Sequence, residues 1–165
     1  MSYDLLVFNP EVAPRDRKEF MSWYQELTKW GEDRDYNSPD GLTGNLPAFY
    51  DTLRIHYPPM NGPHAHNLEP PQGTGLRTKS GLWGKLFGTR PKPSLPAPKF
   101  NEAFVTDYCI AENAIYLAFA WSISAEAYSS VVSTAISTGV GFFDVSASNG
   151  QILHDREQLT DLEIL

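Results

Sequence analysis

Residues 104–121 read FVTDYCIAENAIYLAFAW and contain two apolar, strand-forming runs separated by a short polar connection. The runs are Phe104–Ile110 and Ile115–Trp121, and residues 111–114 (AENA) join them. β-branched and aromatic residues favour strands, and a short connection favours antiparallel pairing of its two neighbours. The stretch therefore predicts a β-hairpin at the centre of the fold.

Further elements are predicted on both sides of this hairpin. Strand-forming composition indicates strands at Tyr3–Phe8 and Gly141–Ser146, with a short edge strand at Ile152–His154. Apolar residues at helical spacing predict three helices, which are listed here with their ends. They run from Pro14 to Trp30, ending before Gly31; from Leu46 to Tyr57, ending before Pro58; and from Ala125 to Ser137, between Ser124 and Gly139.

The predicted order βααββαβ indicates an α+β protein with a mostly antiparallel four-stranded sheet. We expect a ferredoxin-like variant with its helices packed on one face of the sheet. The other face would then be open and available for contacts, because large exposed apolar or aromatic patches mark interaction sites. We expect the acidic C-terminal tail to fray.

A long segment between the second helix and the hairpin is poor in regular structure. Nine of the 13 prolines fall between Pro58 and Pro98, together with many glycines. Proline removes a backbone donor and glycine adds chain entropy, so residues 61–100 are predicted to be a long loop inserted in a single domain of residues 1–165. Its centre, Ser80–Gly88, has the spacing of one amphipathic turn. That turn packs back on the domain, contacts a partner or membrane surface, or is disordered.

The proline-rich segment also differs from the rest of the chain in its charge. Residues 70–101 hold six basic and no acidic residues, whereas the remainder holds seven basic and all 20 acidic residues, a net charge of −13. The whole chain carries −7, which argues against general nucleic-acid affinity. An acidic surface favours a basic partner.

The sequence indicates a cytoplasmic protein. No window reaches 18 apolar residues, and the N-terminus lacks the basic and small-residue regions of a secretion signal. The single cysteine, Cys109, excludes an intramolecular disulfide and a cysteine-based zinc site. We therefore expect no membrane contact through a spanning segment.

Chemistry-bearing residues form only weak constellations. Cys109 in mid-strand is most simply a small buried side chain, although a pairing with His154 stays open. His64 and His66, with Glu69, allow a surface metal contact, but they lie in a proline-bounded loop and a polar loop is the simpler reading. Asp107 and Asp144 lie in strands, either facing solvent or projecting together from the open sheet face to anchor a partner's cation. We expect no catalytic residue, cofactor or metal.

Four segments resemble a known group of proteins. They are Met1–Phe8 (MSYDLLVF), Thr106–Ile110 (TDYCI), Ala118–Trp121 (AFAW) and Gly139–Ser146 (GVGFFDVS). Together they resemble small bacterial cytosolic proteins that look like immunity proteins of polymorphic or contact-dependent toxin systems. The resemblance covers residues 1–62 and 101–148. It implies a non-enzymatic protein that neutralises the C-terminal domain of a cognate toxin by direct binding.

An acidic, aromatic surface would suit this role, because toxin nucleases are commonly basic and aromatic residues dominate interface energetics. The alternative for the acidic residues is a solvated loop. The predicted toxin-binding residues are Trp30, Glu32, Asp33, Asp35, Tyr36, Asp40, Asp51, Asp107 and Asp144. Two other functions stay open: a small enzyme, and a nucleic-acid-associated adaptor that uses the basic loop with its aromatic Trp83 and Phe87.

Overall fold

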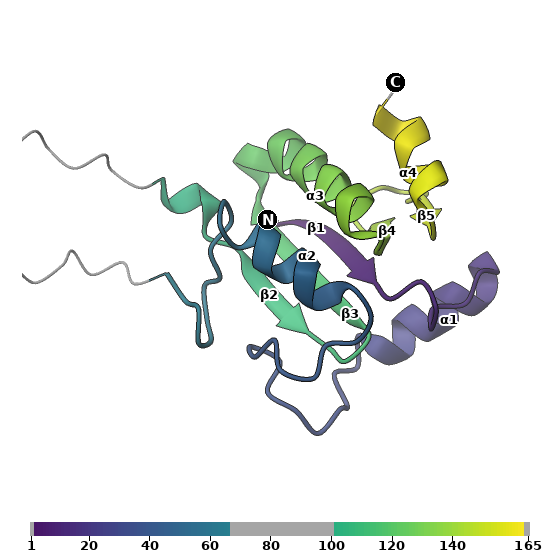
Figure 1. The fold of residues 1–165 in the computed structure, drawn as a ribbon, viewed down its shortest axis with the longest axis horizontal. Coiled ribbons are helices and arrows are strands. Elements are labelled where there is room, and N and C mark those ends of the chain that lie inside the picture. The colour runs from purple at the N-terminus through teal and green to yellow at the C-terminus, as the bar shows by residue number, and fades with distance from the viewer. Residues whose placement is uncertain (1, 67–100, 164–165) are drawn as a thin grey trace, which may run out of the picture. The chain divides into compact units, whose positions relative to one another are not determined.

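A five-stranded antiparallel sheet, in the strand order β2-β3-β1-β4-β5, forms the centre of the protein (Figure 1). The computed structural model describes residues 2–66 and 101–163. Short 3₁₀ turns at Glu102–Phe104 and Trp121–Ile123 flank the β2–β3 hairpin. The remaining elements are β1 (Ser2–Phe8), α1 (Arg17–Leu27), α2 (Leu46–Leu53), β2 (Asp107–Ile110), β3 (Ala114–Ala120), α3 (Ser124–Thr138), β4 (Gly141–Asp144), β5 (Ile152–Leu153) and α4 (Arg156–Glu163).

The central strand β1 is buried on both of its faces. It pairs with β3, where Leu5 is opposite Leu117, and with β4, where Leu6 is opposite Phe143. Side chains alternate between the two faces of a sheet, so Leu5 belongs to one face and Leu6 to the other, and both are fully buried. We call the face that bears Leu5 the first face and the face that bears Leu6 the second face.

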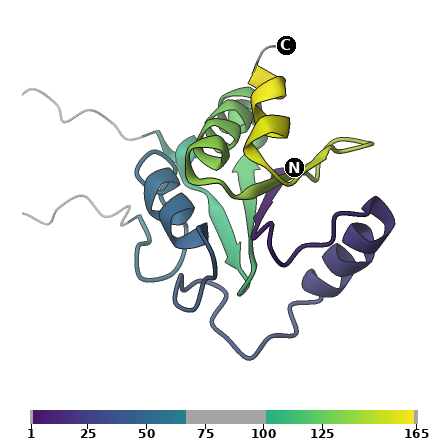
Figure 2. The ribbon, with the colours of Figure 1, turned by 45° about the vertical axis from the view of Figure 1, so that its right-hand side comes forward.

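Helices α2 and α3 cover the first face (Figure 2). The apolar side of α2, with Phe49 and Leu53, and that of α3, with Val131 and Ala135, pack on Leu5 and its neighbours in one core cluster. Leu159 of α4 is buried in the same cluster. The first face is therefore the larger core of the molecule.

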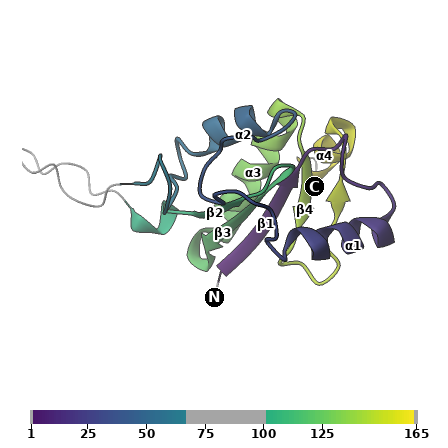
Figure 3. The same cartoon turned by 90° about the horizontal axis from the view of Figure 1, so that it is seen from below.

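Helix α1 lies on the second face, opposite to α2 and α3 (Figure 3). Its Phe20 packs with Leu6, Phe8 and Phe143 in a second core cluster. The prediction that the helices pack on one face is therefore wrong. The physical reason is that β1 and β4 carry large apolar side chains on both faces, and each face needs a cover.

Several predicted boundaries also differ. Helix α1 begins at Arg17, after its cap Asp16 and three residues beyond the predicted start at Pro14, and it ends at Leu27, before the predicted end at Trp30. The C-terminal tail does not fray over its described part but forms α4, where the Asp155 carboxylate accepts a hydrogen bond from the Gln158 N–H. The sheet has five strands where four were expected, because the predicted edge strand at Ile152–His154 forms over Ile152–Leu153 and pairs with β4.

The predicted hairpin is confirmed, with Tyr108 of β2 opposite Leu117 of β3. Most of the predicted loop over 61–100, with its amphipathic turn and basic residues, lies outside the described residues. None of the helices in the described part of the chain is long and apolar enough to cross a membrane.

Candidate protein-binding surface

The second face is only partly covered by α1. Beneath the helix, Leu6 and Phe8 are fully buried. Toward β2 and β3, Asp4, Cys109 and Tyr116 are half-buried, and Asp107 is exposed. This part of the sheet therefore presents polar and aromatic side chains at the surface.

A long acidic connection, residues 28–45, borders this exposed part of the second face; we call it the acidic loop. It runs from α1 on the second face to α2 on the first, past the β2–β3 turn (Figure 1). Several hydrogen bonds attach it: the Glu32 carboxylate accepts from the Glu112 N–H at 2.9 Å, the Thr43 N–H donates to the Glu112 carbonyl at 3.0 Å, and the Tyr36 carbonyl accepts from the Ile110 N–H at 2.8 Å. The loop is therefore held to the end of β2 and to the β2–β3 turn.

Trp30 adopts an unusual backbone conformation at the start of this loop. Its φ is 52°, in the left-handed region that a bulky side chain rarely occupies and that costs about 1–3 kcal/mol. Its ring lies edge-on to Tyr36, with ring centroids 5.4 Å apart, and edge-on to Tyr116, at 6.1 Å. The Tyr36 hydroxyl in turn donates to the Glu32 carbonyl at 3.2 Å. These contacts join the acidic loop to the second face of the sheet.

Tyr116 is also linked to two residues that the sequence prediction did not include. Burial raises the pKa of Tyr116, and so do the charge of Asp4 and its hydrogen bonds with Asp4 and Tyr24. The Oδ1 atom of Asp4 is buried and has no hydrogen-bond partner within the described ranges. Tyr116 itself was also absent from the predicted set. Asp4 and Tyr116 could have been recognised in the sequence, because each is a polar group in an otherwise apolar strand.

Cys109 lies on the same face, opposite Tyr116 in the β2–β3 pairing. Burial raises the pKa of the Cys109 thiol to about 11, and the negative charges of Asp107 and Glu32 contribute to this increase. A thiol with this pKa is protonated near neutral pH and is a poor nucleophile. Two of the predicted carboxylates, Asp107 and Glu32, therefore lie near the Cys109 side chain on the second face.

The structure brings together only part of the predicted set. Tyr36 contacts both Trp30 and Glu32, and Asp33, Asp35 and Asp40 are exposed in the same loop. We call the combined group the acidic–aromatic surface. Its members are these six residues with Asp4, Asp107 and Tyr116.

Two predicted residues lie elsewhere. Asp51 is exposed on α2 and forms an ion pair with Arg54 at 2.8 Å. Asp144 is opposite Leu5 and so belongs to the first face, where it accepts hydrogen bonds from the Tyr3 hydroxyl and from backbone N–H groups. Asp107 and Asp144 therefore point to opposite faces, and the idea that they project together is wrong.

A hollow of about 270 Å³ adjoins the acidic–aromatic surface where α1, the acidic loop and the β2–β3 turn meet. Both of its carboxylates already have partners: Glu26 forms an ion pair with Lys29, and Glu32 lies 3.8 Å from Arg34 and accepts from the Glu112 N–H. The lining residues are Trp23, Glu26, Leu27, Gly31, Glu32 and Asn113.

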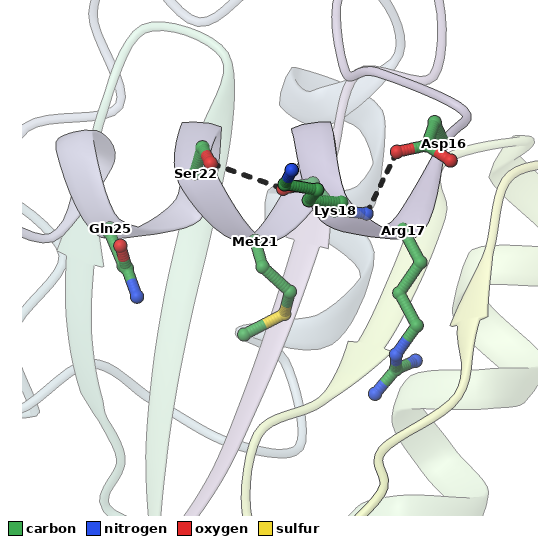
Figure 4. A pocket seen from close by; sticks show the side chains of 6 residues that line it. All are labelled: Asp16, Arg17, Lys18, Met21, Ser22 and Gln25. Atoms are coloured by element: carbon green, nitrogen blue, oxygen red, sulfur yellow. Dashed lines mark hydrogen bonds between the residues drawn. The ribbon is translucent and has the colours of Figure 1, made fainter.

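A larger and more open depression of about 590 Å³ follows the side of α1 (Figure 4). Three of its polar side chains are already engaged: Asp16 caps the helix, Arg17 donates to the Gly150 carbonyl and Asn149, and the Ser22 hydroxyl donates to the Lys18 carbonyl. We assign it no ligand. The arrangement mainly fixes α1 to the turn that follows β4.

The geometry does not support a catalytic pair of Cys109 with His154 or a metal contact at His64 and His66. Cys109 lies in one edge strand, whereas His154 follows the opposite edge strand, so three strands separate them and they form no catalytic pair. His64 is hydrogen-bonded to the Tyr50 hydroxyl at 3.2 Å, and Glu69 lies outside the described residues. Within residues 2–66 and 101–163 no group of three or more potential ligand side chains is placed to hold a metal ion.

Comparison with known proteins gives no relative. No protein-family model, no curated protein and no solved structure matches the chain.

Proposed function

We propose that this chain is an immunity protein that binds and neutralises a cognate bacterial toxin domain by direct contact through the acidic–aromatic surface. In this proposal the protein acts in the bacterial cytoplasm and has no catalytic role. The resemblance of four sequence segments to such proteins supports this proposal, and so does the character of the surface.

The observation that carries the proposal is the way in which Trp30 is held. A bulky residue at φ 52° is a strained feature that persists only where its surroundings fix it, and such residues concentrate at functional sites. Its ring contacts Tyr36 and Tyr116, so three aromatic side chains are ordered before a partner binds. Ordered aromatic residues are the usual anchors of protein interfaces, because little conformational entropy is lost when they bind.

Charge defines the chemistry of the partner. Outside residues 67–100 the chain has seven basic and 19 acidic residues, and the acidic loop that carries Trp30 and Tyr36 also exposes three aspartates. A basic protein surface would gain association rate and specificity from this complementarity. In the adjoining hollow Glu26 and Glu32 are paired with Lys29 and Arg34, so a cation of the partner would replace these pairs there.

The test is coexpression with the C-terminal domain of the toxin encoded beside the gene for this chain. We expect the full chain to restore growth and to retain the toxin domain in a pull-down. Trp30→Gly removes the ring but tolerates the positive φ, and it should weaken binding by about 2 kcal/mol or more. A neighbouring toxin that is not retained by the chain would contradict the proposal.

Charge reversal with a matched control tests the location of the surface. The double variant Asp33→Lys with Asp107→Lys should reduce affinity strongly. Glu126→Lys with Glu157→Lys makes the same change in net charge at exposed positions on α3 and α4, and it should mainly slow association. Equal losses in the two double variants would contradict the assignment of the acidic–aromatic surface.

We also propose a finer description of the fold, a ferredoxin-like variant. The antiparallel order β2-β3-β1-β4, with α2 and α3 on one face, is consistent with it. In this description α1 and β5 are additions, and α1 borders the proposed interface.

A further inference from the structure

His154 is a buried histidine that the proposed function does not use. It follows β5, and its side chain is 6% exposed. Neither ring nitrogen has a hydrogen-bond partner among the residues that the structure describes. Buried polar atoms are normally paired, so an imidazole with two unpaired nitrogens needs an explanation.

The ring of His154 lies between the sheet and α1. It is edge-on to Phe8 of β1, with ring centroids 5.1 Å apart, and edge-on to Phe20 of α1, at 5.9 Å. The His154 backbone N–H donates to the side-chain carbonyl of Gln158 in α4 at 2.8 Å. One residue thus contacts β1, α1 and α4; we call this group the His154 contact.

The groups that face the imidazole do not favour its protonation. From β1 and α1 they are apolar rings, which cannot accept an N–H hydrogen bond as an oxygen would. The charged neighbours are Arg15, from the segment before α1, and Asp155, which form an exposed ion pair with each other at 3.9 Å. Burial lowers the pKa of His154, the charge of Arg15 lowers it further, and Asp155 acts in the opposite direction.

We propose that the His154 contact is a pH-sensitive device that holds α1 against the sheet while the imidazole is neutral and loosens when it is protonated. A protonated ring would bring a charge and two unpaired donors between Phe8 and Phe20. The ring would then leave for solvent beside Asp155 and uncover the ring of Phe20. The device is independent of the partner proposed above.

The expected pH range follows from the direction of the shift. Because the pKa of His154 is lower in the folded chain than in the unfolded chain, its contribution to stability is present above the unfolded value, about 6.5. It is lost as the pH falls from there toward the folded value. In that interval the equilibrium constant for loosening of the His154 contact changes by at most about tenfold per pH unit.

Hydrogen exchange of the full chain, corrected for the intrinsic rate, measures this opening. Between about pH 7.5 and pH 5.5, amides of α1 should lose protection by up to about tenfold per pH unit below 6.5. His154→Phe should remove this dependence, and His56→Phe, at an exposed histidine after α2, should retain it. A pH dependence that persists in His154→Phe would overturn the proposal.

A second measurement does not depend on a variant that folds. Nuclear magnetic resonance of the wild-type imidazoles should give His154 a lower pKa in the folded chain than in the urea-unfolded chain. An equal or higher folded value would overturn the proposal.

Discussion

Gly141 lies in β4 against the ring of Phe8, and this contact shows how closely the sheet and its side chains are packed. A Cβ atom at position 141 would lie 2.2 Å from the Phe8 ring, which is fully buried. A buried ring in a dense core has little room to move. Position 141 is therefore restricted to glycine by packing.

Gly141→Ala should lower the free energy of unfolding by about 1–3 kcal/mol, the usual cost of overpacking a core. Urea denaturation measures the change. Gly31→Ala is the matched control, because a Cβ there meets no atom within 4 Å, and it should change stability by less than about 1 kcal/mol. Similar effects of the two substitutions would contradict the packing argument.

Cys109 should react slowly with thiol reagents. With a pKa of about 11, roughly a thousandth of the thiol is ionised at about pH 8, against about a quarter for an ordinary cysteine. Labelling with Ellman's reagent should be at least about 100-fold slower in the folded than in the urea-unfolded chain. Asp107→Asn removes one of the charges that raise the pKa of Cys109 and should speed the reaction. Equal rates in folded and unfolded chains would contradict this prediction.

Among the secondary-structure elements, α1 determines which part of the second face is buried and which part is exposed. Its apolar side covers the part of the face near β4, and it leaves the part near β2 and β3 to the acidic–aromatic surface. The helix is fixed by its cap Asp16, by Arg17 at the β4–β5 turn, and by Phe20 in the core. A change at the start of α1 therefore tests how strongly the element is anchored.

Asp16→Ala should destabilise the protein by about 1 kcal/mol, because the Asp16 carboxylate accepts hydrogen bonds from the N–H groups of Lys18 and Glu19 at 2.9 and 3.0 Å. Asp16→Ser retains a capping oxygen and should cost only a few tenths of a kcal/mol. Urea denaturation followed by circular dichroism compares the two. Equal losses would show that the carboxylate acts through something other than the cap.

At the scale of the whole molecule, the acidic excess sets the response to salt. The chain has 20 acidic and 13 basic residues, and four ion pairs join acidic and basic side chains over the described ranges. Most of these pairs are well exposed and contribute little to stability. Repulsion among carboxylates is therefore the larger long-range effect.

Raising NaCl from about 0.02 M to about 0.5 M should increase the melting temperature, because the Debye length falls well below about 10 Å and repulsion is screened. An increase of about 2–4 °C would correspond to about 1 kcal/mol for a chain of this size. KCl should act equally if screening is the cause. A fall in melting temperature with either salt would contradict this interpretation.

The local elements followed from the sequence because their signals are local. Alternation and composition predicted β1, the β2–β3 hairpin and β4, and helical spacing predicted α1, α2 and α3. The C-terminal helix was missed, because its described part is mostly polar and its anchoring depends on Leu159 reaching a core built from distant residues. The acidic loop and its aromatic residues were also recognised from composition alone.

What the sequence determined by itself was the α+β class, the central hairpin and the acidic balance, because strand alternation, helical spacing and formal charge depend only on neighbouring residues. Tertiary structure alone decided which face each helix covers, that Asp107 and Asp144 point apart, and that Trp30 reaches Tyr116. These features depend on pairing register and on contacts between residues far apart in the chain. A single-residue change of register moves every side chain of a strand to the other face, and only the packed sheet fixes it.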